Sequence, residues 1–211
     1  MKNEINIDNW DRKEHFHFFS KFDEPYFGIT AELDCTHAYK NSKDNDFSFY
    51  LYYLYLSLKA INEVDEFKLR IDGDKVYSYD TINVSSTVLR DDRTFGFSFI
   101  YFHEDFNQFC SNARKEIDHI KNTTGLQLNK NSSRLDTIHF SSIPWISFTG
   151  LTHTRAFGKD DSVPKISIGK FKTVDNKHYL PVSLNCHHGL MDAIHVSDFL
   201  LKYGQYLGGR F

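Results

Sequence analysis

Residues 185–195 (Asn-Cys-His-His-Gly-Leu-Met-Asp-Ala-Ile-His) place several side chains that can do chemistry close together. Histidine is the natural general base near neutral pH. The run before it, 179–186, alternates apolar and polar residues and predicts a half-buried strand. A strand end that leads into a turn can present a side chain to a cleft. One interpretation is therefore a catalytic His188 beside Asp192, which would share its face if the turn is helical.

Two other interpretations compete with a catalytic histidine. His188, Asp192 and His195 stand at i, i+4 and i+7, so a helix would bring them together as metal ligands. The same residues could also be an ordinary surface turn that collects polar side chains. From residue chemistry alone, the surface turn and the catalytic site are equally plausible interpretations, and the metal site is the least plausible of the three.

Other candidate residues, taken one at a time, are explained by structure as readily as by chemistry. Ser141 could simply end a strand before Pro144, and Arg12 alone would be interpreted as a surface arginine. The side chains that we expect to serve packing or structure are Trp10, Trp145, His187 and His195.

Several stretches together resemble one known family. Residues 187–196 (His-His-Gly-Leu-Met-Asp-Ala-Ile-His-Val) are similar to the HHxxxDGxH signature of the chloramphenicol acetyltransferases. Residues 10–16 (Trp-Asp-Arg-Lys-Glu-His-Phe) resemble the W-x-R-K/R-E-H-F stretch of that family, and 141–148 (Ser-Ser-Ile-Pro-Trp-Ile-Ser-Phe) resemble its S-x-x-P-W-V/I-x-F stretch. Residues 94–95 and 105–109 also fit. The resemblance covers essentially the whole chain.

The resemblance implies a role for each residue of the motifs. His188, the second histidine of the pair, would take the proton from the acceptor hydroxyl, with its other ring nitrogen hydrogen-bonded to its own main-chain carbonyl. Asp192 would form an ion pair with Arg12 and brace the site, so it would not polarise the histidine. Ser141 matches the serine whose hydroxyl steadies the oxyanion of the tetrahedral intermediate.

The resemblance also implies where both substrates bind. Ser167 stands where the family often has a threonine that holds a water in the site. Lys170 is a candidate for the coenzyme A side. The aromatic residues that we expect to contact the acceptor are Phe18, Phe19 and Phe95.

The chemistry of acetyl transfer fits such a site. Attack on a thioester needs a base for the hydroxyl and a donor for the developing oxyanion. The leaving thiolate is weakly basic, since a thiol has a pKa of about 8.5, so a dedicated acid is hardly needed. One histidine and one serine suffice with acetyl-CoA as co-substrate and no metal. The sequence has no glycine-rich phosphate loop, so we expect strand edges, lysine and apolar walls to hold coenzyme A.

Some positions depart from the family pattern and leave the acceptor open. Ala193 replaces the usual glycine, Phe19 stands where many members have tyrosine, and 25–27 and 151–153 differ from the expected drug-contacting stretches. The expected acceptor is chloramphenicol, with antibiotic inactivation as the role. The alternatives are an O-acetyltransferase of the same fold for another hydroxylated small molecule, or a non-catalytic binding protein. The sequence keeps the whole set of His188, Asp192, Arg12 and Ser141. A protein that only binds has no need of this set, which argues against the last alternative.

Periodicity predicts the elements that must position these residues. The run 47–64 is apolar almost all round and predicts a buried helix with Asp46 as its N-cap. The run 104–121 is amphipathic, and 194–207 is a third helix closed by Gly208 and Gly209. The expected strands are 67–71, 75–79, 84–89, 94–102, 137–141, 145–149, 165–171 and 179–186, and 122–134 is expected to be a loop. Several strands with a few long helices indicate one domain, 1–211, folded as a two-layer α/β sandwich with a mixed sheet.

Composition narrows the class of protein and its partners. The net charge is −3 and no run of Lys or Arg dominates, so nucleic-acid binding has no electrostatic footprint. The sequence has no apolar stretch near 18 residues and no basic-then-apolar leader, so we expect neither membrane insertion nor export. The three cysteines lie far apart and predict neither a disulfide framework nor a zinc ribbon. We expect a soluble cytoplasmic protein, and the resemblance implies a homotrimer with sites at subunit interfaces.

Overall fold

A large mixed sheet forms the centre of the computed structural model, which describes residues 1–155 and 161–211. Its strands run in the order β2-β10-β8-β7-β5-β6, with β9 paired to one end of β10. Neighbours are antiparallel except β5 with β7 and β7 with β8, which are parallel. The strands are β2 (Tyr26–Asp34), β5 (Asn83–Leu89), β6 (Phe95–Ile100), β7 (Thr137–Ile143), β8 (Lys165–Gly169), β9 (Lys172–Val174) and β10 (Lys177–His187).

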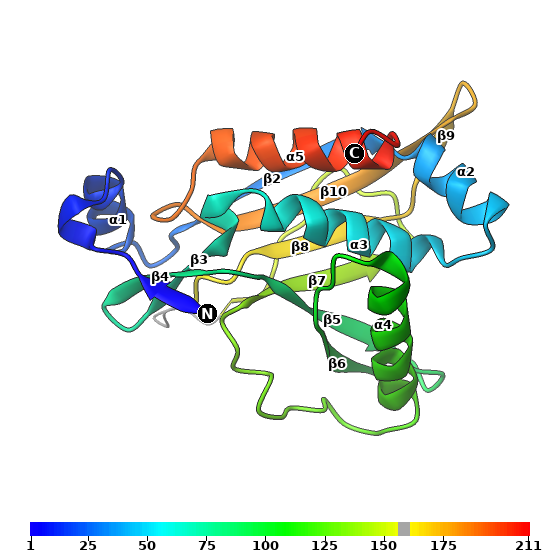
Figure 1. Cartoon of the computed structure of the whole chain (residues 1–211), viewed down its shortest axis with the longest axis horizontal. Helices are drawn as coiled ribbons and strands as arrows, with labels where there is room; N and C mark the ends of the chain where they lie inside the picture. The colour runs from blue at the N-terminus through cyan, green and yellow to red at the C-terminus, as the bar shows by residue number, and fades with distance from the viewer. Residues whose placement is uncertain (156–160) are drawn as a thin grey trace.

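Helices cover one face of this sheet, so the predicted two-layer α/β sandwich is confirmed (Figure 1). Helix α5 (Ala193–Leu207) lies over β2 and β10, α3 (Phe49–Asn62) crosses the middle, and α4 (Phe106–Lys121) packs on β6. Helix α2 (Thr36–Asp44) packs against α3 and α5. The three predicted helices are thus present, each within two residues of its expected bounds.

A smaller three-stranded sheet stands beside the large one, in the order β1-β4-β3. It is formed by β1 (Lys2–Glu4), β3 (Leu69–Asp72) and β4 (Lys75–Tyr79), with the short helices Ile7–Asn9 and Asp65–Lys68 and helix α1 (Lys13–Phe19) nearby in the chain. Phe16 of α1 and Leu190 of the turn after β10 join this sheet in a second, small hydrophobic core. The N-terminal segment is therefore packed against the turn that carries His188.

Helix α3 is buried on nearly all sides, as its sequence predicts. Ser48 caps it, since its hydroxyl accepts a hydrogen bond from the Leu51 N–H at 3.4 Å. The predicted N-cap, Asp46, is wrong, because Asp46 takes a left-handed backbone conformation (φ 54°) that turns the chain before the helix begins. This cap is the kind of local detail that the apolar pattern alone does not fix.

Other elements differ from the sequence-based expectation. The predicted strand 145–149 is wrong, because the chain turns at Pro144 and Trp145 directly after β7. The periodicity did not indicate β1, β2, β9, α1 or α2. Strand β2 lies at the edge of the sheet and is only half buried, and α2 is rich in polar residues, so neither carries a strong apolar pattern. The segment 122–134 is a loop, as predicted.

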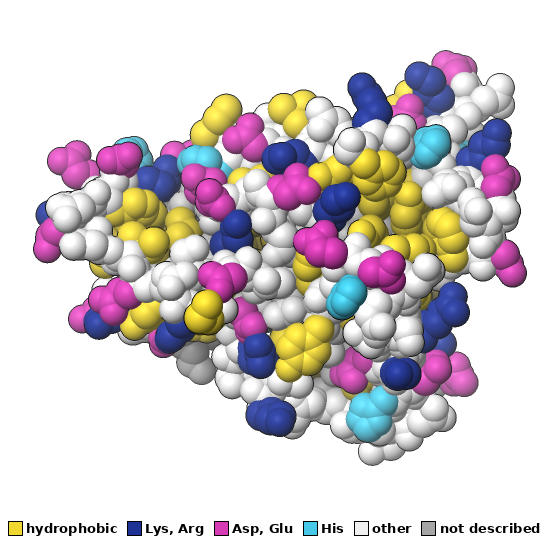
Figure 2. All heavy atoms as spheres, viewed as in Figure 1, with side chains coloured by type: hydrophobic (Ala, Val, Ile, Leu, Met, Phe, Trp, Pro, Cys, Tyr) yellow, Lys and Arg dark blue, Asp and Glu magenta, His cyan; other side chains and the backbone are white. Residues whose placement is uncertain are grey.

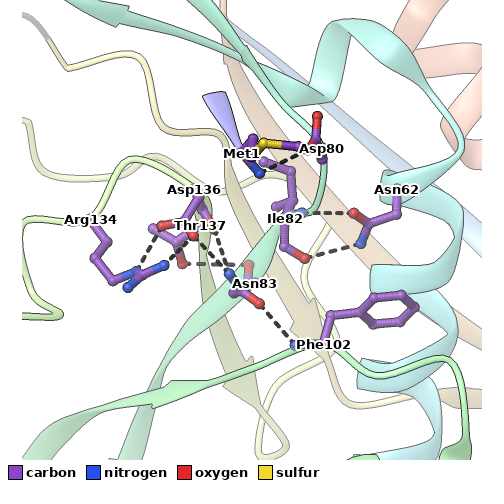
Figure 3. A network of polar contacts seen from close by, with 9 residues as sticks. All are labelled: Met1, Asn62, Asp80, Ile82, Asn83, Phe102, Arg134, Asp136 and Thr137. Atoms are coloured by element: carbon purple, nitrogen blue, oxygen red, sulfur yellow. Dashed lines mark hydrogen bonds and ion pairs between the residues drawn. The ribbon is translucent and has the colours of Figure 1, made fainter. Parts of the chain in front are cut away.

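Polar contacts fix the beginnings of the parallel strands β5 and β7 (Figure 3). The Asn83 side chain donates to the Asp136 carboxylate at 3.0 Å and accepts from the Phe102 N–H at 3.0 Å. Arg134 Nε donates to the same carboxylate at 2.8 Å. The side chain of Asn62 on α3 makes two further bonds to the main chain of Ile82. These contacts hold β7, which carries Ser141, in register with the rest of the sheet.

The helical face of the molecule mixes both signs of charge. Figure 2 shows Lys and Arg side chains interspersed with Asp and Glu over this face, with no gathering of one sign. Such a face lacks the basic patch that nucleic-acid binding needs. Within the described residues, no helix is long and apolar enough to cross a bilayer.

Candidate functional site

His188 lies immediately after β10, where the strand passes into a turn. Its N–H donates to the Pro25 carbonyl at 2.8 Å, which fixes the main chain. Its ring stacks on Phe19 of α1, with ring centroids 4.0 Å apart and planes 8° apart. Phe27 of β2 packs against the ring as well, at 4.6 Å. The imidazole is therefore held between two aromatic side chains, and about a third of it (34%) stays exposed.

An ion pair braces the same turn from the N-terminal segment. Arg12 Nη1 donates to Asp192 Oδ2 at 2.6 Å and Nη2 donates to Oδ1 at 3.0 Å, a bidentate arrangement. Nη2 also donates to the main-chain carbonyl of His188 at 3.2 Å. The bond from Arg12 lowers the pKa of Asp192 below its ordinary value. The ion pair that the resemblance implies is thus present, and Arg12 contacts the main chain of His188 directly. We call Arg12, Phe19, Phe27, His188 and Asp192 the His188 corner.

The ring nitrogens of His188 have different surroundings. Nδ1 is buried 3.1 Å from Asp192 Oδ1, yet it has no hydrogen-bond partner of acceptable geometry among the described residues. The predicted bond from a ring nitrogen to the residue's own carbonyl is therefore not formed here, and that carbonyl accepts from Arg12 instead. Because Nδ1 points into the protein, Nε2 is the nitrogen left to face a substrate.

The residues after His188 do not support the metal hypothesis. Helix α5 begins at Ala193 with Asp192 as its N-cap, so His188 is outside the helix and the i, i+4, i+7 spacing loses its meaning. His195 turns back to the helix start, where its Nδ1 accepts from the Asp192 N–H at 2.9 Å. No three His, Cys, Asp or Glu side chains in the described part of the chain are arranged to hold a metal ion.

His187 has a structural environment, as expected. It is buried, and its Nδ1 accepts a hydrogen bond from the Gly189 N–H at 3.1 Å. Burial lowers the pKa of His187 to about 4. The ring is therefore neutral at pH 7 and shapes the turn that presents His188.

Ser141 lies in a different part of the molecule, on the sheet face opposite the helices. Strand register pairs Ser141 of β7 with Ser167 of β8. Ser141 borders two cavities, one of about 360 Å³ and one of about 1070 Å³. Phe95 of β6, which is 43% exposed, borders both as well. We call the smaller one the Ser141 cavity and the larger one the Trp145 cavity.

The Trp145 cavity has mostly apolar and aromatic walls. Tyr50 and Tyr53 of α3 line it, and the Tyr53 hydroxyl is hydrogen-bonded to Ser142 at 2.7 Å. Lys170, which follows β8 and is exposed, is also part of the lining. Trp145 is 63% exposed here, so its predicted role as a packing anchor is wrong. The lining of the cavity extends from α3 to the end of β8.

The structure does not bring His188 and Ser141 together within one chain. The register aligns Ser141 with Ser167 and Ser167 with Ser183 of β10, five residues before His188. With a rise of about 3.4 Å per residue and about 4.8 Å between strands, His188 is about 17 Å along the sheet and about 10 Å across it from Ser141. The aromatic residues that we expect to contact the acceptor are separated in the same way. Phe18 and Phe19 lie on α1, whereas Phe95 borders the cavities.

Two histidines lie near Ser141; the sequence-based interpretation missed His139, whereas it placed His153 in a stretch (151–153) that departs from the expected drug-contacting pattern. His139 precedes Ser141 by two residues on β7 and borders the same cavity. His153 lies in the following loop, with its Nε2 3.3 Å from the Ser167 hydroxyl. The i, i+2 spacing on a strand is the signal that could have indicated His139, since alternate residues share one face.

Comparison with known proteins agrees with this geometry. A sequence model of the family described as chloramphenicol acetyltransferase matches residues 1–203. Chloramphenicol acetyltransferases from Staphylococcus aureus and Proteus mirabilis are 30% and 27% identical, over 95% and 96% of this chain and 94% and 93% of theirs. A solved structure described as chloramphenicol acetyltransferase superposes with a TM-score of 0.92 at 34% identity, covering 98% of this chain and 100% of that one.

More distant structures share the fold alone. A probable dihydrolipoamide acetyltransferase from Listeria monocytogenes superposes with a TM-score of 0.68 at 13% identity, covering 93% of this chain and 89% of its own. The family match extends over nearly all of the sequence, including the turn of His188 and the strand of Ser141. This chain belongs to the chloramphenicol acetyltransferase family.

Proposed function

We propose that this protein transfers the acetyl group of acetyl-CoA to a hydroxyl of chloramphenicol, inactivating the antibiotic, with His188 as general base. The observation that carries the proposal is the His188 corner. A histidine stacked between aromatic rings, braced through Arg12 and left with one accessible ring nitrogen is arranged to take a proton. The family match and the relatives named above support acetyl transfer as the reaction.

The role of His188 follows from how its ring is held. Its Nε2 would remove the proton of the attacking hydroxyl as the oxygen bonds to the thioester carbonyl carbon. The same nitrogen then returns a proton when the tetrahedral intermediate collapses and the thiol leaves. The stacking on Phe19 fixes the plane of the ring, so little orientational freedom is lost in the transition state.

Ser141 would supply the donor to the oxyanion. Charge develops on the carbonyl oxygen as the intermediate forms, and a hydroxyl aimed at that oxygen stabilises the charge. Ser167 lies directly beside Ser141 on the next strand and can hold a water in the same place. The Trp145 cavity, with aromatic walls and Lys170 at the end of β8, would hold acetyl-CoA next to Ser141.

The separation of His188 from Ser141 supports a site shared between subunits. We propose a homotrimer in which the His188 corner of one chain faces the Ser141 cavity of its neighbour, each chain contributing one domain over residues 1–211. Apolar side chains at both regions are exposed in the single chain, among them Phe18, Phe22, Phe95 and Trp145. Exposed aromatic surface of this kind marks an association site. The three buried cysteines carry no disulfide, in keeping with our proposal that the enzyme works in the cytoplasm.

The test is a thiol-release assay with acetyl-CoA and chloramphenicol, combined with a complementation experiment. His188→Ala and Ser141→Ala chains carrying different tags are co-expressed, and mixed oligomers are purified through both tags. In a cyclic trimer each mixed oligomer has about one intact site in three, so it regains about a third of wild-type turnover although both parents are nearly inactive. Two differently tagged His188→Ala chains are the matched control and stay inactive. Mixed oligomers that show only the residual activity of their parents contradict the shared site.

A second candidate differs only in the acceptor. His139 and His153 place polar groups where the Ser141 cavity would take the acceptor, and these groups can also bind another hydroxylated small molecule. A panel of hydroxylated compounds in the same assay, ranked by kcat/KM against chloramphenicol, decides between the two.

A further inference from the structure

Tyr26, the first residue of β2, lies beside the turn that carries His188. The strand register pairs Tyr26 with His187 of β10, and the two rings pack edge to face with their centroids 5.8 Å apart. The residue before it, Pro25, provides the carbonyl that accepts the His188 N–H at 2.8 Å. The start of β2 is therefore part of what holds the turn of His188.

The side chain of Tyr26 contacts a different segment, the one that leads into β8. Its hydroxyl donates to the main-chain carbonyl of Asp161 at 2.9 Å, and the carbonyl of Val163 lies 3.2 Å from the same hydroxyl. Burial, followed by the Asp161 carboxylate, raises the pKa of Tyr26 well above its ordinary value, so the hydroxyl is protonated at neutral pH and can donate. Because Val163 stands two residues before Lys165, where β8 begins, these contacts fix the entry of that strand.

Two cations also pack against the ring of Tyr26. The Arg155 guanidinium lies 4.6 Å from the ring centroid and the Lys165 ammonium lies 4.8 Å from it, within the range of a cation–π attraction. One carboxylate oxygen of Glu24 accepts from the Tyr26 N–H at 3.1 Å, and the other lies 3.1 Å from Arg155 Nε. Lys165 is in turn paired with the Asp161 carboxylate. We call Glu24, Tyr26, Arg155, Asp161 and Lys165 the Tyr26 cluster.

The Tyr26 cluster reaches the strand that lies beside Ser141. Lys165 stands two residues before Ser167 on β8, so the two side chains share one face of the sheet. Ser167 is paired with Ser141 on the neighbouring strand. The cluster therefore connects the turn of His188, through the start of β2, to the strand next to Ser141.

Such a connection matters because each chain of the proposed trimer takes part in two active sites. It gives His188 to one site and its Ser141 cavity to the next. A misplacement of about 1 Å can cost about 100-fold in rate even when it arises far from the reacting atoms. Both regions of one chain must therefore be held in position at the same time.

We propose that Tyr26 is a positioning residue that ties the turn of His188 to the start of β8, so that each chain holds its parts of two neighbouring active sites in one fixed relation. Tyr26 acts through the groups that it holds. The inference rests on the proposed function, in that His188 and Ser141 are taken as the reacting groups, but the tie itself can be measured without acetyl transfer.

The first experiment measures the tie in the full-length protein without substrates. Tyr26→Phe removes the hydroxyl and keeps the ring between its two cations, so the variant should fold. Hydrogen exchange is followed by mass spectrometry. We expect the amides of residues 162–167 and of 186–190 to exchange about 5- to 10-fold faster than in the wild type, the effect of one net hydrogen bond at the upper end of its range.

Two further variants make this result specific. Tyr55→Phe is the matched control, because the Tyr55 hydroxyl also donates to a main-chain carbonyl, that of Glu104 at 2.6 Å, but within the helical layer. It should leave both segments as in the wild type. Glu24→Gln keeps an oxygen that can accept from the Tyr26 N–H and removes the charge that pairs with Arg155. It should speed exchange in the same two segments, by less than Tyr26→Phe does.

Thiol release separates positioning from folding. Tyr26→Phe should lower kcat about 10-fold, a part of what a misplaced group can cost. Equilibrium binding of acetyl-CoA should not change, because the described lining of the Trp145 cavity contains no member of the Tyr26 cluster. Tyr55→Phe should destabilise the protein to a similar degree and leave kcat unchanged, whereas a purely structural role of Tyr26 would give the two variants the same kcat.

Mixed oligomers of His188→Ala and Ser141→Ala chains show whether both regions depend on Tyr26. Their intact site takes His188 from one chain and Ser141 from the other, so Tyr26→Phe can be placed in either chain. We expect turnover to fall in both arrangements. A loss in only one arrangement would show that Tyr26 supports a single region and would overturn the tie.

Two other outcomes would overturn the inference as well. They are wild-type exchange in both segments of Tyr26→Phe, and a kcat of this variant equal to that of Tyr55→Phe. Failure of the proposed function looks different, because it would show as no His188-dependent thiol release with any acceptor and as inactive mixed oligomers. Hydrogen exchange would still decide whether Tyr26 ties the two regions.

Discussion

The His188 corner and the Ser141 cavity differ in how firmly their side chains are held. Every group around His188 is fixed by a strong contact: the stacked Phe19, the bidentate Arg12 and the main-chain bond to Pro25. The Ser141 cavity is an open space between strands and a loop, and its imidazoles face solvent. A group that transfers a proton needs one geometry, whereas a surface that recognises an acceptor can change its residues without losing the reaction. The difference teaches that the two regions of the proposed site are held in different ways, one by fixed side-chain contacts and the other by the walls of a cavity.

The largest expected effect is at His188, the proposed general base. His188→Ala should lower kcat by about 10²–10⁴, because a positioned general base contributes that much. Acetyl-CoA should still bind, since the Trp145 cavity lies in the other region. Thiol release and equilibrium binding of acetyl-CoA measure the two effects. Near wild-type thiol release by this variant would remove the His188 corner from the mechanism.

At the Ser141 cavity, Ser141→Ala should lower kcat by about 10²–10³ with little change in either KM, because the bond to the oxyanion forms chiefly in the transition state. Steady-state kinetics with both substrates varied measure this. A change in KM with kcat preserved would mean that Ser141 only binds substrate.

The brace of the His188 corner can be tested through coupling. Asp192→Asn and Arg12→Ala should each lower both kcat and the free energy of unfolding. The free energy of unfolding should fall by about 1–3 kcal/mol, because each substitution leaves a half-buried partner without its bond. The double variant should cost less than the sum of the two, because the partners act as a unit. Denaturant unfolding and kcat of all four proteins give the coupling energy. Additive losses would show that the ion pair does not act as a unit.

Acid should weaken the turn that presents His188. Burial lowers the pKa of His187 from 6.5 to about 4, so the unfolded chain binds a proton below about pH 6.5 that the folded chain refuses. The free energy of unfolding should therefore fall as the pH drops from 6.5 toward 4, by up to about 3 kcal/mol for this residue.

His187→Asn separates this contribution, because asparagine can still accept the Gly189 N–H bond but does not titrate. Unfolding measured between pH 7 and 4 should show a shallower decline for the variant than for the wild type. Parallel curves would assign the acid sensitivity to other groups, such as His139.

The smallest expected effect is that of Phe19→Tyr, which tests whether α1 contacts the acceptor or acetyl-CoA. Phe19→Tyr keeps the ring that stacks on His188 and adds one hydroxyl. We expect the KM of the acceptor to change several-fold, with kcat and the KM of acetyl-CoA nearly constant. An effect confined to acetyl-CoA would place α1 on the other side of the site.

Strong local patterns in the sequence predict the fold class, and the family resemblance predicts the Arg12–Asp192 ion pair of the His188 corner. Helix α3 is apolar on all sides, so its burial could be predicted. The family resemblance predicted that Arg12 pairs with Asp192, and the structure contains this pair. The spacing of the residues in the sequence could not have predicted a contact between positions so far apart. Strand 145–149 was predicted wrongly, since an apolar run after Pro144 lacks the pairing partner that makes a strand.

The Ser141 cavity could be predicted only in part. The separation of Ser141 from His188 depends on strand register, which is set by pairing between β7, β8 and β10 and not by the composition of any one strand. His139 lies beside the serine because it stands two residues before it on the same strand. His153 lies on an irregular loop, so no periodicity indicates its contact with Ser167.

The Arg12–Asp192 ion pair also has a consequence for how the protein is made. Its partners are 180 residues apart in a chain of 211, so the loop that they close contains almost the whole sequence. During synthesis Arg12 leaves the ribosome long before its carboxylate exists, and contacts this distant in sequence form late and slowly. An unfinished or truncated chain that lacks Asp192 cannot brace the main chain of His188 in this way. His188 therefore gains the support of this ion pair only when nearly all of the polypeptide is present.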